Sequence, residues 1–131
     1  MKPETQLRIG RVAAFYPIFR HLLAPLVITV RERAAQELSP EDTLIYLGVG
    51  CLLALPLLAA SVGFYWALLR KKLKVAIVLF VIHTLWALWN GICAIVNGEG
   101  VGTLSFEVVM LLLLLQGILG IRKMHMFASR G

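Results

Sequence analysis

The sequence has 131 residues, of which 60% are hydrophobic, and its mean hydropathy is +0.84. This composition excludes an ordinary soluble domain. The net charge of +6 could suggest a nucleic-acid-binding protein. However, the Lys and Arg residues cluster in short segments beside the apolar runs, which is typical of membrane topology and not of a binding patch. We therefore expect the lipid bilayer, and no nucleic acid, as a partner.

The first candidate span, residues 12–30, is the least certain from hydropathy, because Arg20 lies at its centre. A central Arg costs about 2.5–3.5 kcal/mol on insertion scales. The distribution of basic residues decides whether this segment crosses the membrane. If this segment spans, ten of the thirteen Lys and Arg residues lie on one side and two on the other. If it does not, the division is seven against six, with no positive-inside bias. We therefore predict that it spans, distorted by its prolines.

Three further runs, 44–69, 75–96 and 103–121, reach the length needed to cross hydrocarbon. Ser39 followed by Pro40 and two acidic residues predicts the start of the helix before the first of these runs. The prediction is an all-α integral membrane protein: a four-helix antiparallel transmembrane bundle that forms a single domain over residues 1–131. The charge bias places both termini in the cytoplasm, and with the small size it suggests the bacterial inner membrane.

The run 75–96 carries its polar residues on one side. At about 100° per residue, His83, Trp86 and Asn90 fall within a narrow arc, at a spacing typical of a packing seam. At 1.5 Å per residue, His83 and Trp86 come near the membrane midplane, as do Arg20 and His21 of the first span. We predict a polar layer at this depth with these members: Arg20, His21, His83, Trp86, Asn90 and Glu107. Interhelical hydrogen bonding explains such a layer better than a proton relay does.

Arg20 requires a partner in the membrane, where an unpaired charge is costly. Glu107 is the only acidic residue within any predicted span, and the long Arg side chain could reach it. Two alternatives stay open. Glu107 could instead favour the N-terminal turns of its own helix, and Arg20 could bind Asn90 or a carbonyl freed near Pro17.

The last span offers a second feature, because Glu107 and Gln116 are nine residues apart and project from opposite faces. If Glu107 faces the bundle, Gln116, Gly117 and Gly120 face outward. Small residues permit close helix approach, so we predict a homo-oligomer contact at these three positions. Ala59 and Gly63 offer a similar strip.

The sequence holds no catalytic triad, paired carboxylates, phosphate-binding loop or Cys-x-x-Cys motif, so we do not expect an enzyme. His21 and His83 could ligate a haem, and Met124, His125 and Met126 could hold copper. No haem motif supports the first, and adjacent residues on a helix point apart in the second. We expect no cofactor and no metal.

Two functions remain. The first is a non-enzymatic accessory or assembly subunit that is homo-oligomeric or bound to a larger membrane complex. The second is a channel or transporter for a small solute, proton or ion along the polar layer, where the positive charge of Arg20 would favour anions.

Overall fold

The computed structural model describes the backbone of residues 1–130 and the side chains of residues 1–129, and this part of the chain is helical apart from short turns. The helices are α1 (Pro3–Ala13), α2 (Phe15–Gln36), α3 (Pro40–Leu69), α4 (Leu73–Val96) and α5 (Gly102–Arg130). Four segments are long and apolar enough to cross a membrane: Pro3–Gln36, Pro40–Leu69, Leu73–Val96 and Gly102–Ser129. The predicted all-helical fold with four helices long and apolar enough to cross a membrane is confirmed for the described residues. The first segment is longer than the predicted 12–30, because α1 extends it toward the N-terminus.

The break between α1 and α2 falls at Ala14, three residues before Pro17. A proline lacks the N–H that would bond the carbonyl four residues earlier, and its ring collides with that carbonyl. For Pro17 the carbonyl is that of Ala13, the last residue of α1. The chain therefore changes direction where the sequence placed a proline.

The start of α3 follows the predicted capping pattern. The backbone N–H of Asp42 donates to the Oγ of Ser39 at 3.1 Å, and Pro40 occupies the first helical position. The predicted helix start at Ser39 is confirmed.

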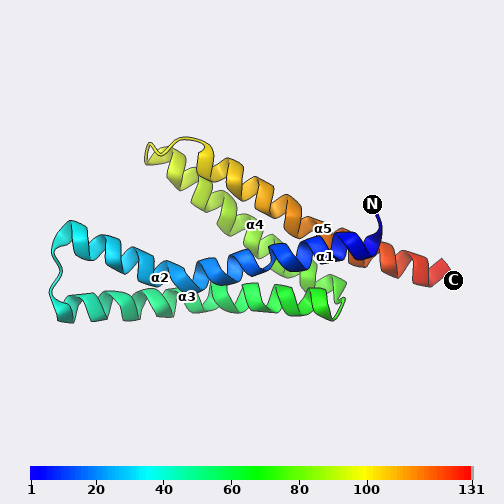
Figure 1. The fold of residues 1–131 in the computed structure, drawn as a ribbon, viewed down its shortest axis with the longest axis horizontal. Coiled ribbons are helices and arrows are strands. Elements are labelled where there is room, and N and C mark those ends of the chain that lie inside the picture. Colours follow the sequence, from blue (N-terminus) through cyan, green and yellow to red (C-terminus); the bar gives the residue numbers. More distant parts are fainter. Residues whose placement is uncertain (131) are drawn as a thin grey trace.

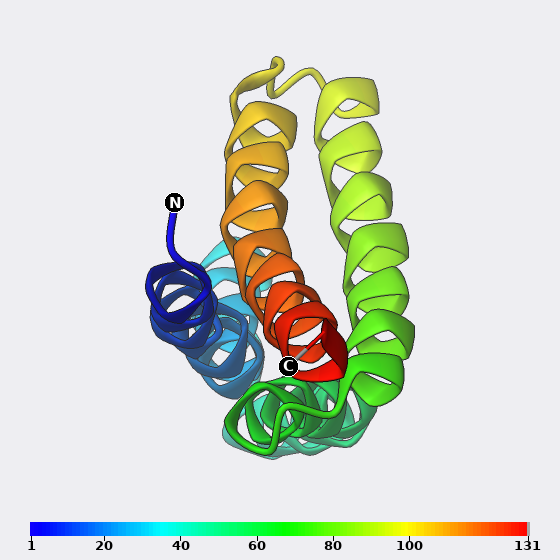
Figure 2. The ribbon, with the colours of Figure 1, turned by 90° about the vertical axis from the view of Figure 1, so that its right-hand side faces the viewer.

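The helices form two hairpins that diverge. Figure 1 shows α2 beside α3 and α4 beside α5, with both termini and the α3–α4 turn at one end of the molecule. Away from that end, the α4–α5 hairpin tilts away from the α2–α3 hairpin, which is also visible in Figure 2. In the described chain, no Cα atom of α2 comes within 8 Å of one in α4 or α5. We call the end with the termini the closed half, and the divergent end the open half.

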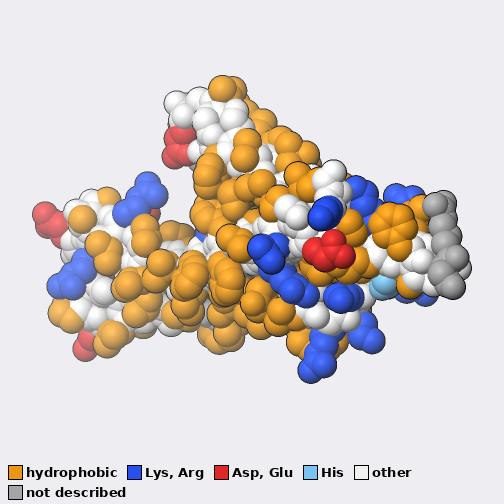
Figure 3. Space-filling model, turned by 45° about the vertical axis from the view of Figure 1, so that its right-hand side comes forward, with side chains coloured by type: hydrophobic (Ala, Val, Ile, Leu, Met, Phe, Trp, Pro, Cys, Tyr) orange, Lys and Arg blue, Asp and Glu red, His pale blue; other side chains and the backbone are white. Residues whose placement is uncertain are grey.

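The hydrophobic core lies in the closed half. Its largest fully buried side chains are Phe64, Leu68 and Ile121, from the C-terminal parts of α3 and α5. Leu7 of α1 and Ala76 of α4 complete the cluster. Figure 3 shows Lys and Arg side chains gathered around this end and an apolar surface across the middle of the molecule.

Helix α1 holds the closed half together by packing along α5. A Cβ atom on Gly10 would lie 2.3 Å from the Cα of Gly117, so the two backbones touch at this crossing. A Cβ on Gly120 would lie 2.7 Å from the carbonyl oxygen of Pro3. The close approach expected of these glycines is therefore made within one chain.

The same contact accounts for Gln116, whose Oε1 accepts a hydrogen bond of 3.0 Å from the Nε2 of Gln6. Gln116, Gly117 and Gly120, the residues predicted to contact a second copy, are thus covered by α1. The sequence indicated the small-residue surface but assigned it the wrong kind of partner, because the N-terminal helix was not expected to lie there.

Candidate functional site

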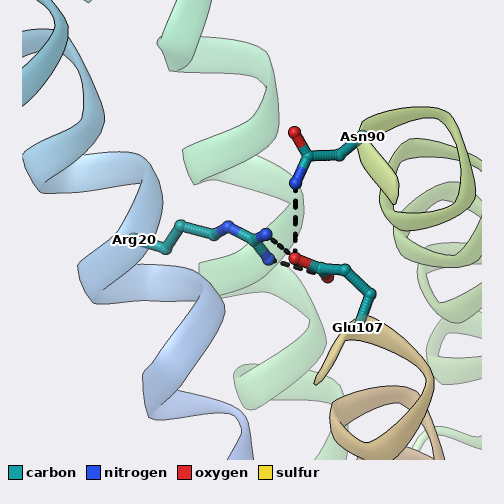
Figure 4. Close-up of polar contacts among 3 residues, drawn as sticks. All are labelled: Arg20, Asn90 and Glu107. Carbon is teal, nitrogen blue, oxygen red and sulfur yellow. Dashed lines mark hydrogen bonds and ion pairs between the residues drawn. The ribbon is translucent and has the colours of Figure 1, made fainter. Parts of the chain in front are cut away.

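A buried ion pair bridges the two hairpins at the junction of the closed and open halves. Arg20 of α2 and Glu107 of α5 form a salt bridge, and Arg20 Nη1 donates to Glu107 Oε2 at 2.9 Å. Asn90 Nδ2 of α4 donates to Glu107 Oε1 at 3.4 Å, so three helices meet at one carboxylate (Figure 4). The side chains of Arg20 and Glu107 are 19% and 3% exposed. Of the partners considered for Arg20, the structure selects the only acid of the predicted spans.

Aromatic rings surround the guanidinium. Its Cζ lies 4.4 Å from the ring centroid of Trp86 and 5.2 Å from that of Tyr16. A cation over the face of an aromatic ring is attracted by the ring quadrupole, most strongly by Trp. The edge of the same Trp86 ring also meets His21, with centroids 4.8 Å apart and planes at 81°. Trp86 therefore packs in the interior, as expected of a midplane tryptophan.

A small cavity lies at the ion pair. Five of the six residues predicted for the polar layer line it: Arg20, His21, His83, Trp86 and Glu107. Asn90, the sixth, reaches the group through its hydrogen bond to Glu107. The cavity volume is only about 20 Å³, close to the minimum for one water molecule. In this conformation, no solute larger than water fits between these side chains.

His83 lines this cavity, but its hydrogen bonds are to Ser61 and Leu79 and not to the ion pair. Its Nε2 lies 3.1 Å from the hydroxyl of Ser61 in α3, and its Nδ1 lies 2.7 Å from the carbonyl oxygen of Leu79. Both ring nitrogens are thus satisfied, and the side chain connects α4 to α3 rather than to α2. The predicted polar layer therefore has two parts, the Arg20–Glu107–Asn90 cluster and the Ser61–His83 pair.

Two members of the site were missed by the sequence reasoning. The hydroxyl of Ser61 also lies 2.8 Å from the carbonyl oxygen of Leu57, so its polarity could be satisfied within its own helix and gave no signal. Tyr16 was missed because tyrosine is common at membrane interfaces. Its place one turn before Arg20 on α2 was the available signal.

A much larger groove opens beside the small cavity, with a volume of about 720 Å³. It runs along α2 and α3 into the open half, and Trp86 is the only residue of α4 that lines it. His21 and Trp86 line both the groove and the small cavity. The groove wall is mostly apolar, with residues such as Ile28, Val49 and Leu53.

The arrangement of these side chains offers hydrogen bonding and a paired charge. Among residues 1–130, no three His, Cys, Asp or Glu side chains gather as metal ligands would. Comparison with known proteins adds no assignment: no protein-family model, curated protein or solved structure matches the chain. A functional proposal must therefore come from the geometry.

Proposed function

We propose that this protein is a non-enzymatic accessory or assembly subunit of a membrane complex, inserted as four antiparallel spans with both termini in the cytoplasm. The topology follows from the basic residues that surround the closed half, since Lys and Arg favour the cytoplasmic side. A bacterial inner membrane accords with the same charge bias.

The observation that carries the proposal is an unpaired stripe along α3. In the most apolar window of α3, 6% of the residues are buried, against 22–33% in the other three spans. One exposed face of α3 repeats at alternating steps of four and three residues: Gly48, Leu52, Leu55, Ala59, Val62 and Trp66. A helix packed at a small crossing angle contacts its partner at such positions, which repeat about every 3.5 residues.

The small residues of α3 divide between its two sides. A Cβ on Gly63 would lie 3.1 Å from Leu79 Cδ1, so Gly63 serves the packing of α3 on α4. A Cβ on Gly48 would meet no atom within 4 Å, and Ala59 is also exposed. Gly48 and Ala59 therefore leave room for a helix of another subunit to approach the stripe. This site replaces the one expected around Gly117.

Native mass spectrometry of protein gently extracted from its own membrane tests the proposal. We expect a mass above that of one chain, from a second copy or another membrane protein. Ala59→Phe should reduce the assembled fraction severalfold, because a bulky ring holds the approaching helix away. Val109→Phe, at an exposed position of α5, is the matched control and should leave assembly unchanged. A wild-type protein that travels only as a lone monomer would rule out the subunit function.

Transport is the second candidate function, and the groove is the observation in its favour. The groove leads to His21 and Trp86, which border the Arg20–Glu107 pair, so a path exists up to the pair but not beyond it. A transport cycle would have to open the pair. Proteoliposome flux that falls on Glu107→Gln would support this function, and the absence of flux for the wild-type protein would exclude it.

A further inference from the structure

The groove between α2 and α3 has the dimensions of a ligand site. Its volume of about 720 Å³ lies within the range of about 300–1,000 Å³ that is common for small-molecule pockets. Along α3 it extends from Asp42 to Leu57, which at 1.5 Å per residue corresponds to roughly 22 Å. This length exceeds the roughly 15 Å of hydrocarbon in one leaflet. The groove is therefore long, narrow and mostly apolar.

Its deep end holds a polar side chain with unused bonding capacity. His21 is 4% exposed and lines the groove. Among the described residues, His83 forms hydrogen bonds through both ring nitrogens, whereas His21 forms none. A neutral imidazole carries one donor and one acceptor nitrogen, and leaving both unpaired in a membrane interior is unfavourable. The groove thus contains one buried group that is available to hydrogen-bond an occupant.

The charges around the deep end favour a neutral head group. Arg20 and Glu107, the nearest charged residues, neutralise each other in the ion pair. The charged residue that lines the groove itself is Asp42, at the opposite end, where it would repel an anion. An ionic head group would therefore find no unpaired opposite charge beside His21.

We propose that the groove binds one long-chain lipid with a neutral hydroxyl or carbonyl head, which hydrogen-bonds His21 while its chain extends along α2 and α3 toward Asp42. This site is independent of the outward stripe of α3, so it does not rest on the proposed subunit function.

The volume favours a lipid chain over a transmembrane helix of another protein. A helix about 10 Å in diameter would occupy roughly 1,700 Å³ over the length of the groove, so the groove could not enclose it. A helix also satisfies its own backbone hydrogen bonds, so it would leave His21 unpaired unless it placed a polar side chain at that depth. A neutral lipid head supplies the missing bond directly.

Quenching of Trp86 fluorescence tests both binding and orientation, because Trp86 contacts His21 at the foot of the groove. Trp66→Phe and Trp89→Phe leave Trp86 as the single tryptophan. The protein is reconstituted in vesicles of unbrominated phosphatidylcholine and titrated with 4,5-dibromohexadecan-1-ol. We expect saturable quenching. The 15,16-dibromo isomer should saturate equally but quench less, because its bromines lie at the far end of the groove.

Three variants of the single-tryptophan protein identify the site. His21→Phe keeps a ring against Trp86 but removes the hydrogen bond, and we expect about fivefold weaker binding. Ala54→Phe fills the groove and should abolish saturable quenching. Ala59→Phe places the same ring about 140° around α3 and should leave quenching unchanged, whether or not it alters assembly.

Quenching that rises linearly with the bromoalcohol, as simple partition into the bilayer would give, overturns the proposal. So does saturable quenching that His21→Phe and Ala54→Phe leave unaltered. An unchanged Trp86 emission maximum before titration shows that each variant keeps the local fold, so neither result can be ascribed to misfolding.

Discussion

Long apolar helices run through both the closed and the open half of this molecule, yet the two hairpins pack against each other only in the closed half. Helix α3 passes through both and shows the difference within a single element. Phe64 and Leu68 near its C-terminal end are 1% and 0% exposed, whereas Leu44 and Leu52 nearer its start are 70% and 68% exposed. Hydrophobicity therefore does not decide which half of α3 is buried.

Side-chain size accounts for the difference. In a bilayer, apolar side chains gain little by leaving lipid for each other, so helices associate where close packing is possible. The closed half supplies small residues at its crossings, among them Gly10, Gly117 and the fully buried Ala67 and Ala76. On α2 and α3 the open half exposes larger side chains such as Leu26 and Leu52, which are satisfied by lipid, beside the small Gly48. Small residues thus permit the close crossings of the closed half.

The ion pair lies where packing ends. No Cα of α2 approaches α5 within 8 Å, yet Arg20 and Glu107 span that gap. Long side chains can connect helices whose backbones have already diverged. We infer that the pair fixes the angle between the hairpins, with Asn90 holding the carboxylate from the third helix.

The largest effect should come from removing one member of this pair. Arg20→Ala removes the cation that pairs with Glu107, a residue that is only 2% exposed in the native fold. Breaking a buried pair in this way costs about 3–5 kcal/mol. We expect a free energy of unfolding lower by that amount, measured by denaturation in mixed micelles, together with a wider distance between spin labels on the two outer loops.

Charge reversal provides the control for this prediction. Arg20→Glu and Glu107→Arg should each destabilise the protein strongly, and the double variant should recover part of the loss because opposite charges again face each other. Additive losses in the double variant would show that the pair does not couple the hairpins.

An intermediate effect is expected at the crossing of α1 and α5. Gly10→Ala places a Cβ against the backbone of Gly117, which cannot move as a flexible side chain could. Overpacking of this kind typically costs about 1–3 kcal/mol. We expect that loss in the free energy of unfolding and faster proteolysis of the α1 segment.

Gly48→Ala is the matched control, because a Cβ at Gly48 meets no atom within 4 Å. It should be neutral or slightly stabilising, since alanine favours helix more than glycine does. An equal gain in stability at Gly10 and Gly48 would mean that helix propensity, and not the α1–α5 contact, governs both changes.

The sequence predicted four long apolar helices and named the Arg20–Glu107 pair as one of several possibilities, but it did not predict the divergence of the hairpins. Charged residues are scarce in the spans, so Glu107 was the one acidic partner available to Arg20 within the membrane. Leu44 and Leu52 would look the same in the sequence whether they faced lipid or another helix. No sequence pattern therefore predicted that the hairpins separate in the open half. The docking of α1 was missed because Arg8 and Arg11 suggested a cytoplasmic segment, while Gly117 and Gly120 indicated a close contact without naming its partner.

The smallest effect should come from Ser61, whose hydroxyl lies 3.1 Å from His83 in the packed part of α3. Ser61→Ala removes an interhelical hydrogen bond, and such bonds average about 0.6 kcal/mol in membrane proteins. Ser105→Ala is the matched control, since the hydroxyl of each serine lies within hydrogen-bond distance of the carbonyl oxygen four residues earlier but Ser105 is exposed. The difference between the two variants in free energy of unfolding therefore isolates the bond to His83. A difference near zero would mean that the Ser61–His83 hydrogen bond does not stabilise the fold. The contact of α3 with α4 would then depend on packing at Gly63 and not on this polar pair.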